Sequence, residues 1–216
     1  NFFISREYIQ NASDSIDEAV ETGLLSDKMY GPGVMPYQPP GIWNVVYSGQ
    51  KWETSKGEDA YRRGIYTFIR RSGAYPSFIT FDGSSRDVCV SRRINTNTPL
   101  QALTIWNDVV FTECAQNLGR RIVTEVEASG KVENDIQRRI YHAFLTCLAR
   151  RPTRHEMTIV SKFYQTQLEQ LSKDDQGAKE VLGESPMPEA ASLAETASWV
   201  AVARALLNTD EFITKE

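Results

Sequence analysis

Cysteine and histidine are scarce in this chain of 216 residues, and their spacing excludes several common sites. The three cysteines, Cys89, Cys114 and Cys147, form no Cys-x-x-Cys or Cys-x-x-Cys-His pattern, which argues against structural zinc and covalently attached haem within this chain. The two histidines, His142 and His155, have no second ligand four residues away, so we expect no metal site. Buried free thiols are expected for the cysteines, with a Cys114–Cys147 disulfide as the alternative.

Other missing sequence patterns argue against further classes of protein. No run approaches about 18 apolar residues, so no transmembrane helix is expected. The start, NFFISREYIQ, lacks a Met and the basic-then-apolar order of a signal peptide, and we therefore expect a fragment or processed form of a longer protein. No GxGxxG, P-loop or GxSxG motif is present, which argues against nucleotide cofactors and a serine nucleophile elbow. The net charge of −4 argues against nucleic-acid binding.

The positive charge is unevenly distributed and consists of arginine in the middle of the chain. Residues 62–93 hold seven arginines and two acids, whereas lysine is missing from 57–130. Arginine in place of lysine indicates fixed, forked hydrogen bonding rather than loose surface charge. Two interpretations follow: the basic segment docks against the acidic residues 1–27, or it forms an anion site.

The hydrophobic pattern predicts a mainly α-helical single domain with an irregular front half, 1–97. An apolar stripe over 6–24 predicts a helix, and GPGVMPYQPPG, residues 31–41, predicts an extended loop with Met35, Tyr37 and Trp43 packed inward. We expect the aromatic rings near this loop to anchor it, although exposed rings can also stack on sugars. The apolar runs 64–69 and 77–82 could pair as a small β-hairpin.

The second half, 98–216, predicts an antiparallel helical assembly. A capping box at Thr98 opens one helix, whose core stripe runs from Leu103 to Ile122. Further helices are expected over 134–149, from a second capping box at Thr153, and over 188–208. The charged segment 172–188 is expected to be a loop.

The segment that precedes the Thr98 capping box is the candidate site. Its polar residues are Asp82, Arg86, Asp87, Arg92, Arg93, Asn95, Asn97 and Thr98. A helix N-terminus offers N–H donors, and neighbouring arginines would help it to bind sulfate, carboxylate or phosphate. Alternatively, Asp82 or Asp87 pairs with an arginine and only orders the loop. The two acids are poor candidates for glycosidase chemistry, because nearby arginines would lower the pKa of both.

Four stretches occur in a distinctive order: GPGVMPYQPPGIW, YRRGIYTFIRR, FITFDGSSRDVCVSRRINTNTPLQAL and ARALLNTDEF. In these stretches the chain resembles the planctomycete-type domain of unknown function that ends large exported proteins, often with a c-type cytochrome module upstream. The resemblance implies a periplasmic or extracellular location and sibling domains as partners. It also implies an anionic glycan as a partner, since genomic neighbours often include sulfatases and polysaccharide-degrading enzymes. Any haem c would lie in an upstream domain.

The function that follows from the resemblance is a C-terminal binding or scaffolding module. It would belong to an exported, cytochrome c-associated multidomain protein linked to the breakdown of sulfated or complex polysaccharides. The alternative is an enzyme that acts on anionic glycans, with its site in the 82–98 loop. A convergent pocket with unpaired polar groups would favour the enzyme, and an arginine-rich or apolar surface would favour the module.

Overall fold

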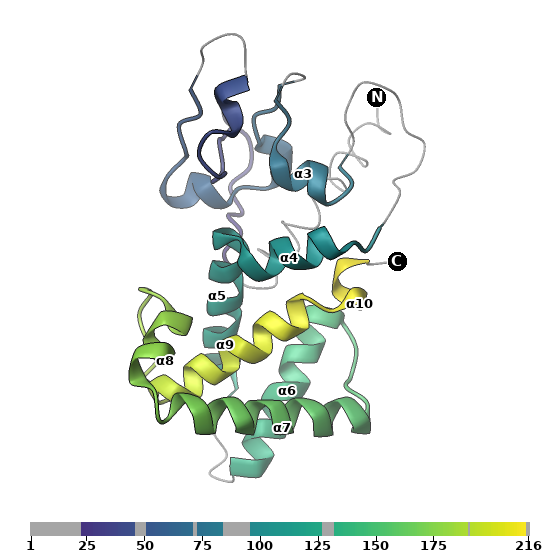
Figure 1. Cartoon of the computed structure of the whole chain (residues 1–216), viewed down its shortest axis with the longest axis vertical. Coiled ribbons are helices and arrows are strands. Elements are labelled where there is room, and N and C mark those ends of the chain that lie inside the picture. Colours follow the sequence, from purple (N-terminus) through teal and green to yellow (C-terminus); the bar gives the residue numbers. More distant parts are fainter. Residues whose placement is uncertain are drawn as a thin grey trace. The chain divides into compact units, whose positions relative to one another are not determined.

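The computed structural model describes residues 23–45, 51–70, 73–83, 96–126, 132–189 and 191–214. These residues form eight α-helices, three 3-10 helices and no β-strand, so the mainly α prediction is confirmed (Figure 1). The chain divides into two compact units: unit 1 holds Asn1–Val20 and Leu24–Ala102, and unit 2 holds Glu21–Gly23 and Leu103–Glu216. The single-domain arrangement stays a prediction, and the helix expected over 6–24 lies almost entirely outside the described residues.

Aromatic rings form the core of unit 1. Trp43, in the 3-10 helix η1 (Ile42–Val45), is buried and packs edge-to-face on Trp52, with their ring centroids 5.0 Å apart. Trp52 stacks in turn on Tyr75 at 6.0 Å. Each of these pairs falls in the range in which aromatic contacts add to simple area burial.

Two aromatic side chains also hold the proline-rich loop through its backbone. Trp52 Nε1 donates to the carbonyl of Pro36 at 2.8 Å, and Tyr75 Oη donates to that of Tyr37 at 2.7 Å. The predicted anchoring is therefore confirmed for Trp43 and Trp52. The prediction that Tyr37 packs inward is wrong, because 36% of this residue is exposed.

The β-hairpin considered for 64–69 and 77–82 does not form. The first run enters the 3-10 helix η3 (Gly64–Tyr66), which follows η2 (Gly57–Tyr61), and the second forms helix α3 (Pro76–Thr80). Pro76 favours the first turn of a helix because its ring fixes φ near the helical value. The partner of the first run is Val34, whose N–H donates to Tyr66 at 2.7 Å and whose carbonyl accepts from Phe68 at 2.8 Å.

The capping box at Thr98 is present, but the helix it opens is shorter than predicted. Thr98 N donates to Gln101 Oε1 at 2.7 Å, and Gln101 N donates to Thr98 Oγ1 at 3.3 Å. Helix α4 (Pro99–Asn107) ends before Asp108, whose side chain caps α5 (Val109–Glu125) by accepting from Val110 N at 2.9 Å. The core position predicted for Leu103 is wrong, because 59% of it is exposed.

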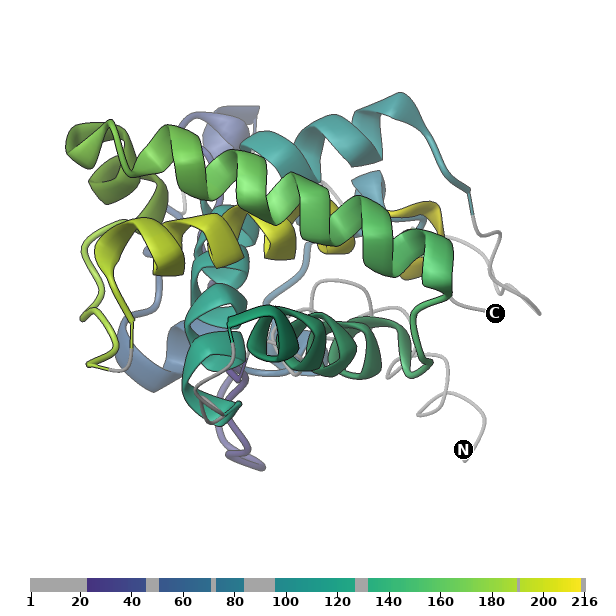
Figure 2. The same cartoon turned by 90° about the horizontal axis from the view of Figure 1, so that it is seen from below.

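Unit 2 packs around helix α9 (Leu193–Leu207), which contacts α5 and α7 (Arg154–Leu171). Gly119 of α5 lies directly against Val200 of α9, where a Cβ atom would be only 2.7 Å from the valine. Tyr164 of α7 packs on Trp199 of α9, with ring centroids 4.5 Å apart. Helices α7 and α9 run side by side in opposite directions, in agreement with the predicted antiparallel assembly (Figures 1 and 2). Helix α6 (Val132–Leu148) contacts both of them.

The segment 172–188 is not the loop that its charge suggested. It contains helix α8 (Asp175–Leu182), which Asp174 caps by accepting from Gly177 N at 2.9 Å. Gly183 ends this helix with φ +72°, a backbone conformation that favours glycine. Helix α9 begins after Ser192 rather than at residue 188, and the short α10 (Asp210–Ile213) follows it.

The described cysteines are unbridged. Cys114 and Cys147 are both buried and form no disulfide in this structure, which confirms the expectation of buried thiols for these two. Cys89 lies outside the described residues. Among the described helices, none is long and apolar enough to cross a membrane.

Candidate functional site

Most of the predicted site lies outside the described residues. Arg86, Asp87, Arg92, Arg93 and Asn95 belong to this part of the chain, so the anion site and the ion-paired loop both stay predictions. Asp82, Asn97 and Thr98 are described.

One carboxylate oxygen of Asp82 orders the approach to α4. Its Oδ2 accepts from the N–H of Thr96 at 2.9 Å, from the Thr96 hydroxyl at 2.6 Å and from Gln101 Nε2 at 3.3 Å. Asp82 adopts φ +57°, and a Cβ on the following Gly83 would be 2.5 Å from the carbonyl oxygen of Phe78. The described partners of Asp82 are therefore a threonine and a glutamine, which hold a tight turn.

Gln101 also makes a hydrogen bond outside the capping box. It is 1% exposed, and its Nε2 also donates to the carbonyl of Thr80 at 3.0 Å. Pro99 has no N–H, and the N–H of Gln101 is bonded to Thr98. Two of the first donors of α4 are therefore not available to an anion, so its N-terminus is a weaker anion site than the sequence suggested.

Arg62 shows how the arginine-rich segment is used. This residue is only 4% exposed, and its guanidinium donates to the carbonyls of Lys28 (3.1 Å), Tyr30 and Pro32 (3.4 Å). It also lies 3.8 Å above the centroid of the Tyr66 ring. For Arg62, the predicted fixed, forked hydrogen bonding is confirmed, and its acceptors are backbone carbonyls. No local pattern indicated which carbonyls it would bind.

Residues 28–32, here the anchored loop, present two large side chains at their tip. Tyr30 is 80% exposed although its backbone is held at both ends, since its N–H donates to Tyr66 Oη at 2.8 Å and its carbonyl accepts from Arg62. Its φ of +65° lies in the left-handed region, which is strained for a residue with a bulky side chain. Met29 is 53% exposed, and its sulfur lies 2.8 Å from Arg63 Nη1.

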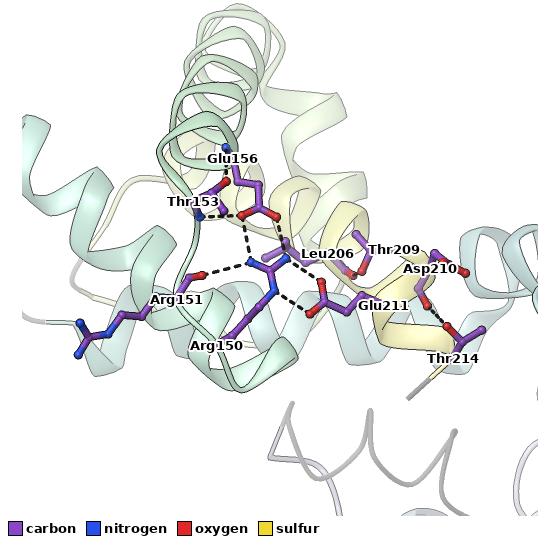
Figure 3. A network of polar contacts seen from close by, with 9 residues as sticks. All are labelled: Arg150, Arg151, Thr153, Glu156, Leu206, Thr209, Asp210, Glu211 and Thr214. Atoms are coloured by element: carbon purple, nitrogen blue, oxygen red, sulfur yellow. Dashed lines mark hydrogen bonds and ion pairs between the residues drawn. The ribbon is translucent and has the colours of Figure 1, made fainter. Parts of the chain in front are cut away.

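In unit 2, Arg150 holds two carboxylates from distant parts of the chain (Figure 3). Its Nη atoms donate to both oxygens of Glu156, at 2.7 and 3.0 Å, and its Nε and Nη2 donate to Glu211, each at 2.7 Å. Glu156 also accepts from the N–H of Thr153 at 2.7 Å and so completes the predicted capping box of α7. The hydrogen bonds from Arg150 lower the pKa of Glu156 to about 2 and lower that of Glu211.

The histidines are not part of a metal centre in the described structure. His142 Nε2 lies 3.0 Å from Glu125 Oε2, and the same carboxylate accepts from Arg121 Nε at 2.8 Å through its other oxygen. His155 is exposed within the first turn of α7. Across the part of the chain that the structure describes, no three His, Cys, Asp or Glu side chains are grouped as metal ligands.

Comparison with known proteins gives a family without an assigned activity. No curated protein and no solved structure matches the chain significantly. Residues 11–164, well over half of the chain, match the family PSD1, described as a protein of unknown function (DUF1553). The planctomycete and cytochrome associations stay predictions. The chain belongs to this DUF1553 family.

Proposed function

We propose that this chain is a binding or scaffolding module of an exported, cytochrome c-associated multidomain protein, and that it contacts a sibling domain through the anchored loop. Sulfated or complex polysaccharides are the material on which the whole protein acts. The observation that carries this proposal is the exposure of Tyr30 and Met29 on a backbone that Arg62 and Tyr66 hold rigid.

The chemistry of the loop tip suits a protein partner. Tyrosine, methionine and arginine are enriched at protein interfaces, and tyrosine is a frequent hot spot because it buries a large area with few rotatable bonds. Arg63 lies beside Met29, and 97% of the Asp27 side chain is exposed next to it. A pair of charged side chains therefore lies beside Met29.

The rigidity of the loop supports a role in binding. A flexible loop loses conformational entropy when it binds, whereas a loop already held in place loses less. The strained φ of Tyr30 costs roughly 1–2 kcal/mol. Buried Arg62 spans three carbonyls and offsets that cost, so the surrounding structure maintains a conformation that the local sequence does not favour.

The described part of the 82–98 loop offers less to the enzyme alternative. Oδ2 of Asp82 is engaged by Thr96 and Gln101, which hold it to the turn before α4 rather than present it to a substrate. The binding module is therefore the function that the described geometry supports best.

The experiment is a titration of this chain with the upstream segment of the full-length protein, produced separately and measured by calorimetry. Tyr30→Ser should weaken binding at least about tenfold, as expected for a central aromatic contact, with an unchanged melting temperature. Ile79→Ser, at a 67% exposed position of the same unit, is the matched control and should bind like the wild type. Equal affinities for Tyr30→Ser and wild type would contradict the proposal. Release of new reducing ends from a sulfated oligosaccharide would support the enzyme instead.

A further inference from the structure

Met29 differs from the other methionines of the chain in the group that lies beside its sulfur. Of the four methionines, Met29 and Met187 are the exposed ones, at 53% and 50%. The sulfur of Met29 lies 2.8 Å from Nη1 of Arg63. In the described part of the chain, no hydrogen-bond donor is bonded to the sulfur of Met187. The two side chains therefore have similar access to solvent, and only one of them has a charged donor on its sulfur.

The surroundings of Met29 fix the orientation of this contact. Arg62 donates to the carbonyls of the two residues that flank Met29 in the sequence, so the backbone is held on both sides. Nη2 of Arg63 lies 3.6 Å from Oδ1 of Asp27, and this ion pair directs the other amino group of Arg63 to the sulfur. The sulfur therefore has one side against a guanidinium and keeps the other side for solvent.

An exposed thioether reacts with peroxides, and the stereochemistry of the product depends on which of its two lone pairs attacks. A sulfur lone pair forms the new S–O bond while the O–O bond of the peroxide breaks. The leaving hydroxide takes the proton from the transferred oxygen, so the products are a sulfoxide and water. Sulfur is oxidised by two electrons, and the peroxide is reduced by two. Because Arg63 occupies one lone pair of Met29, the other lone pair reacts and one sulfoxide epimer forms.

The sulfoxide fits the contact that Met29 already has. Its oxygen is a much stronger hydrogen-bond acceptor than a thioether sulfur, and the charged Arg63 is a suitable donor for it. The backbone of the anchored loop does not depend on the Met29 side chain, since hydrogen bonds from Arg62 and to Tyr66 hold it. Oxidation therefore changes the polarity of the loop tip and keeps the contacts that determine its shape.

We propose that Met29 is a reversible peroxide-oxidation site, at which Arg63 directs the formation of one sulfoxide epimer, and that its oxidation weakens the contact of the anchored loop with the sibling domain. The regulatory part rests on the proposed function, because it acts on the surface that Tyr30 and Met29 present. A sulfoxide loses more hydration than a thioether when a protein partner covers it, and this lowers the affinity. A methionine sulfoxide reductase with a thiol as electron donor restores the thioether.

The first test measures the epimer of each sulfoxide after treatment of the folded 216-residue chain with hydrogen peroxide. The chain is then digested, and the peptides are divided between two methionine sulfoxide reductases, each specific for one epimer, with dithiothreitol as reductant. Mass spectrometry gives the fraction repaired at each methionine. We expect one reductase alone to repair about nine-tenths of the Met29 sulfoxide but only about half of the Met187 sulfoxide.

Arg63→Gln decides whether the guanidinium causes the selectivity. In this variant the Met29 sulfoxide should approach the even epimer ratio of Met187, because the charged donor on one side of the sulfur is gone. An even ratio at Met29 in the wild-type chain would overturn the proposal, and so would an unchanged bias in Arg63→Gln. The comparison of Met29 with Met187 within the wild-type chain does not depend on how the variant folds.

The second test repeats the calorimetric titration with the upstream segment of the full-length protein before and after oxidation of this chain, with the peroxide removed before mixing. Oxidation should weaken binding about tenfold, and repair by the reductase should restore it. Met187→Leu keeps the thioether at position 29 and should show the same loss. Met29→Leu has no sulfur there, so its affinity should be the same before and after treatment.

The outcomes of the two tests are distinguishable. An unchanged affinity of the oxidised wild-type chain, or an equal loss in Met29→Leu, would overturn the regulatory part. If the untreated chain does not bind the upstream segment, the proposed function and the regulatory part both fail. The epimer ratio still decides in that case whether Met29 is the oxidation site that Arg63 directs.

Discussion

Replacement of Glu156 by glutamine should lower the free energy of unfolding of unit 2 by an amount that depends on pH. In the native chain, Glu156 joins two structures, because it completes the capping box of α7 with Thr153 and accepts two hydrogen bonds from Arg150. Through Arg150 it is coupled to Glu211, 55 positions later in the chain, next to the start of α10 (Figure 3). Glutamine keeps the shape and one carbonyl acceptor but loses the charge.

The magnitude follows from the pKa of Glu156, which the Arg150 hydrogen bonds lower from 4.5 to about 2. At about 1.4 kcal/mol per unit, such a difference corresponds to roughly 3 kcal/mol. The side chain is 30% exposed, and solvent screens an ion pair at that depth. We therefore expect a loss of about 1–2 kcal/mol in the free energy of unfolding at neutral pH.

The sign of the pH dependence is fixed by the direction of the pKa change. Because the carboxyl binds its proton less readily in the folded chain than in the unfolded chain, its contribution is complete above pH 4.5. It is lost as the pH falls from 4.5 through about 2, below which the carboxyl is protonated in both states. The difference between wild type and Glu156→Gln should therefore shrink across this window.

Urea unfolding of both proteins at several pH values measures this difference. Glu169→Gln is a suitable control, since Glu169 pairs with Lys173 on an exposed turn of the same helix and its loss should change little. A Glu156→Gln deficit that stays constant between neutral and acidic pH would refute the reasoning, because it would locate the effect in shape or capping rather than in charge.

Three further predictions concern single positions. Gly119→Ala should lower the free energy of unfolding by about 2 kcal/mol or more, because its Cβ would lie 2.7 Å from Val200, although alanine is the better helix former. Thermal unfolding measures this loss, and a stabilised variant would show that α5 and α9 separate easily. Thr98→Ala should cost about 1 kcal/mol in urea unfolding through the lost cap, and an unchanged midpoint would mean that Gln101 alone holds the start of α4. Arg62→Lys should speed proteolysis within residues 28–32, since one ammonium group cannot donate to three carbonyls at once. Cleavage at the wild-type rate would show that the guanidinium of Arg62 is not needed to hold this loop.

The sequence pattern predicted the helix caps, because a cap depends only on residues that are neighbours in the sequence. Both capping boxes lie where the spacing of a threonine and a Glu or Gln three residues later placed them. Helix α8 was missed because its charge suggested a loop, yet Asp174 and Gly183 bracket it with an ordinary cap at each end. The break at Asp108 was missed for the opposite reason, because the apolar stripe continued across it.

Long-range pairing accounts for the other misses. The run at 64–69 has the composition of a strand, but its partner is Val34, in a segment whose prolines indicated only an extended loop. Glu211 could not be assigned to Arg150 from the sequence, since 61 residues separate them. For the site, arginine composition predicted the kind of contact that Arg62 makes, whereas the exposure of Tyr30 depends on tertiary contacts that no local pattern records.

Arg62 and Arg150 show one physical solution to two different problems. Unit 1 has little regular structure in its described part, so many of its carbonyls lack the partners that helices and sheets provide. A buried guanidinium with several donors can bind three such carbonyls at once and fix the direction of the loop that carries them. In unit 2 the helices satisfy their own backbone, and Arg150 can join two carboxylates instead. The same residue type therefore orders irregular backbone in one unit and connects helix ends in the other.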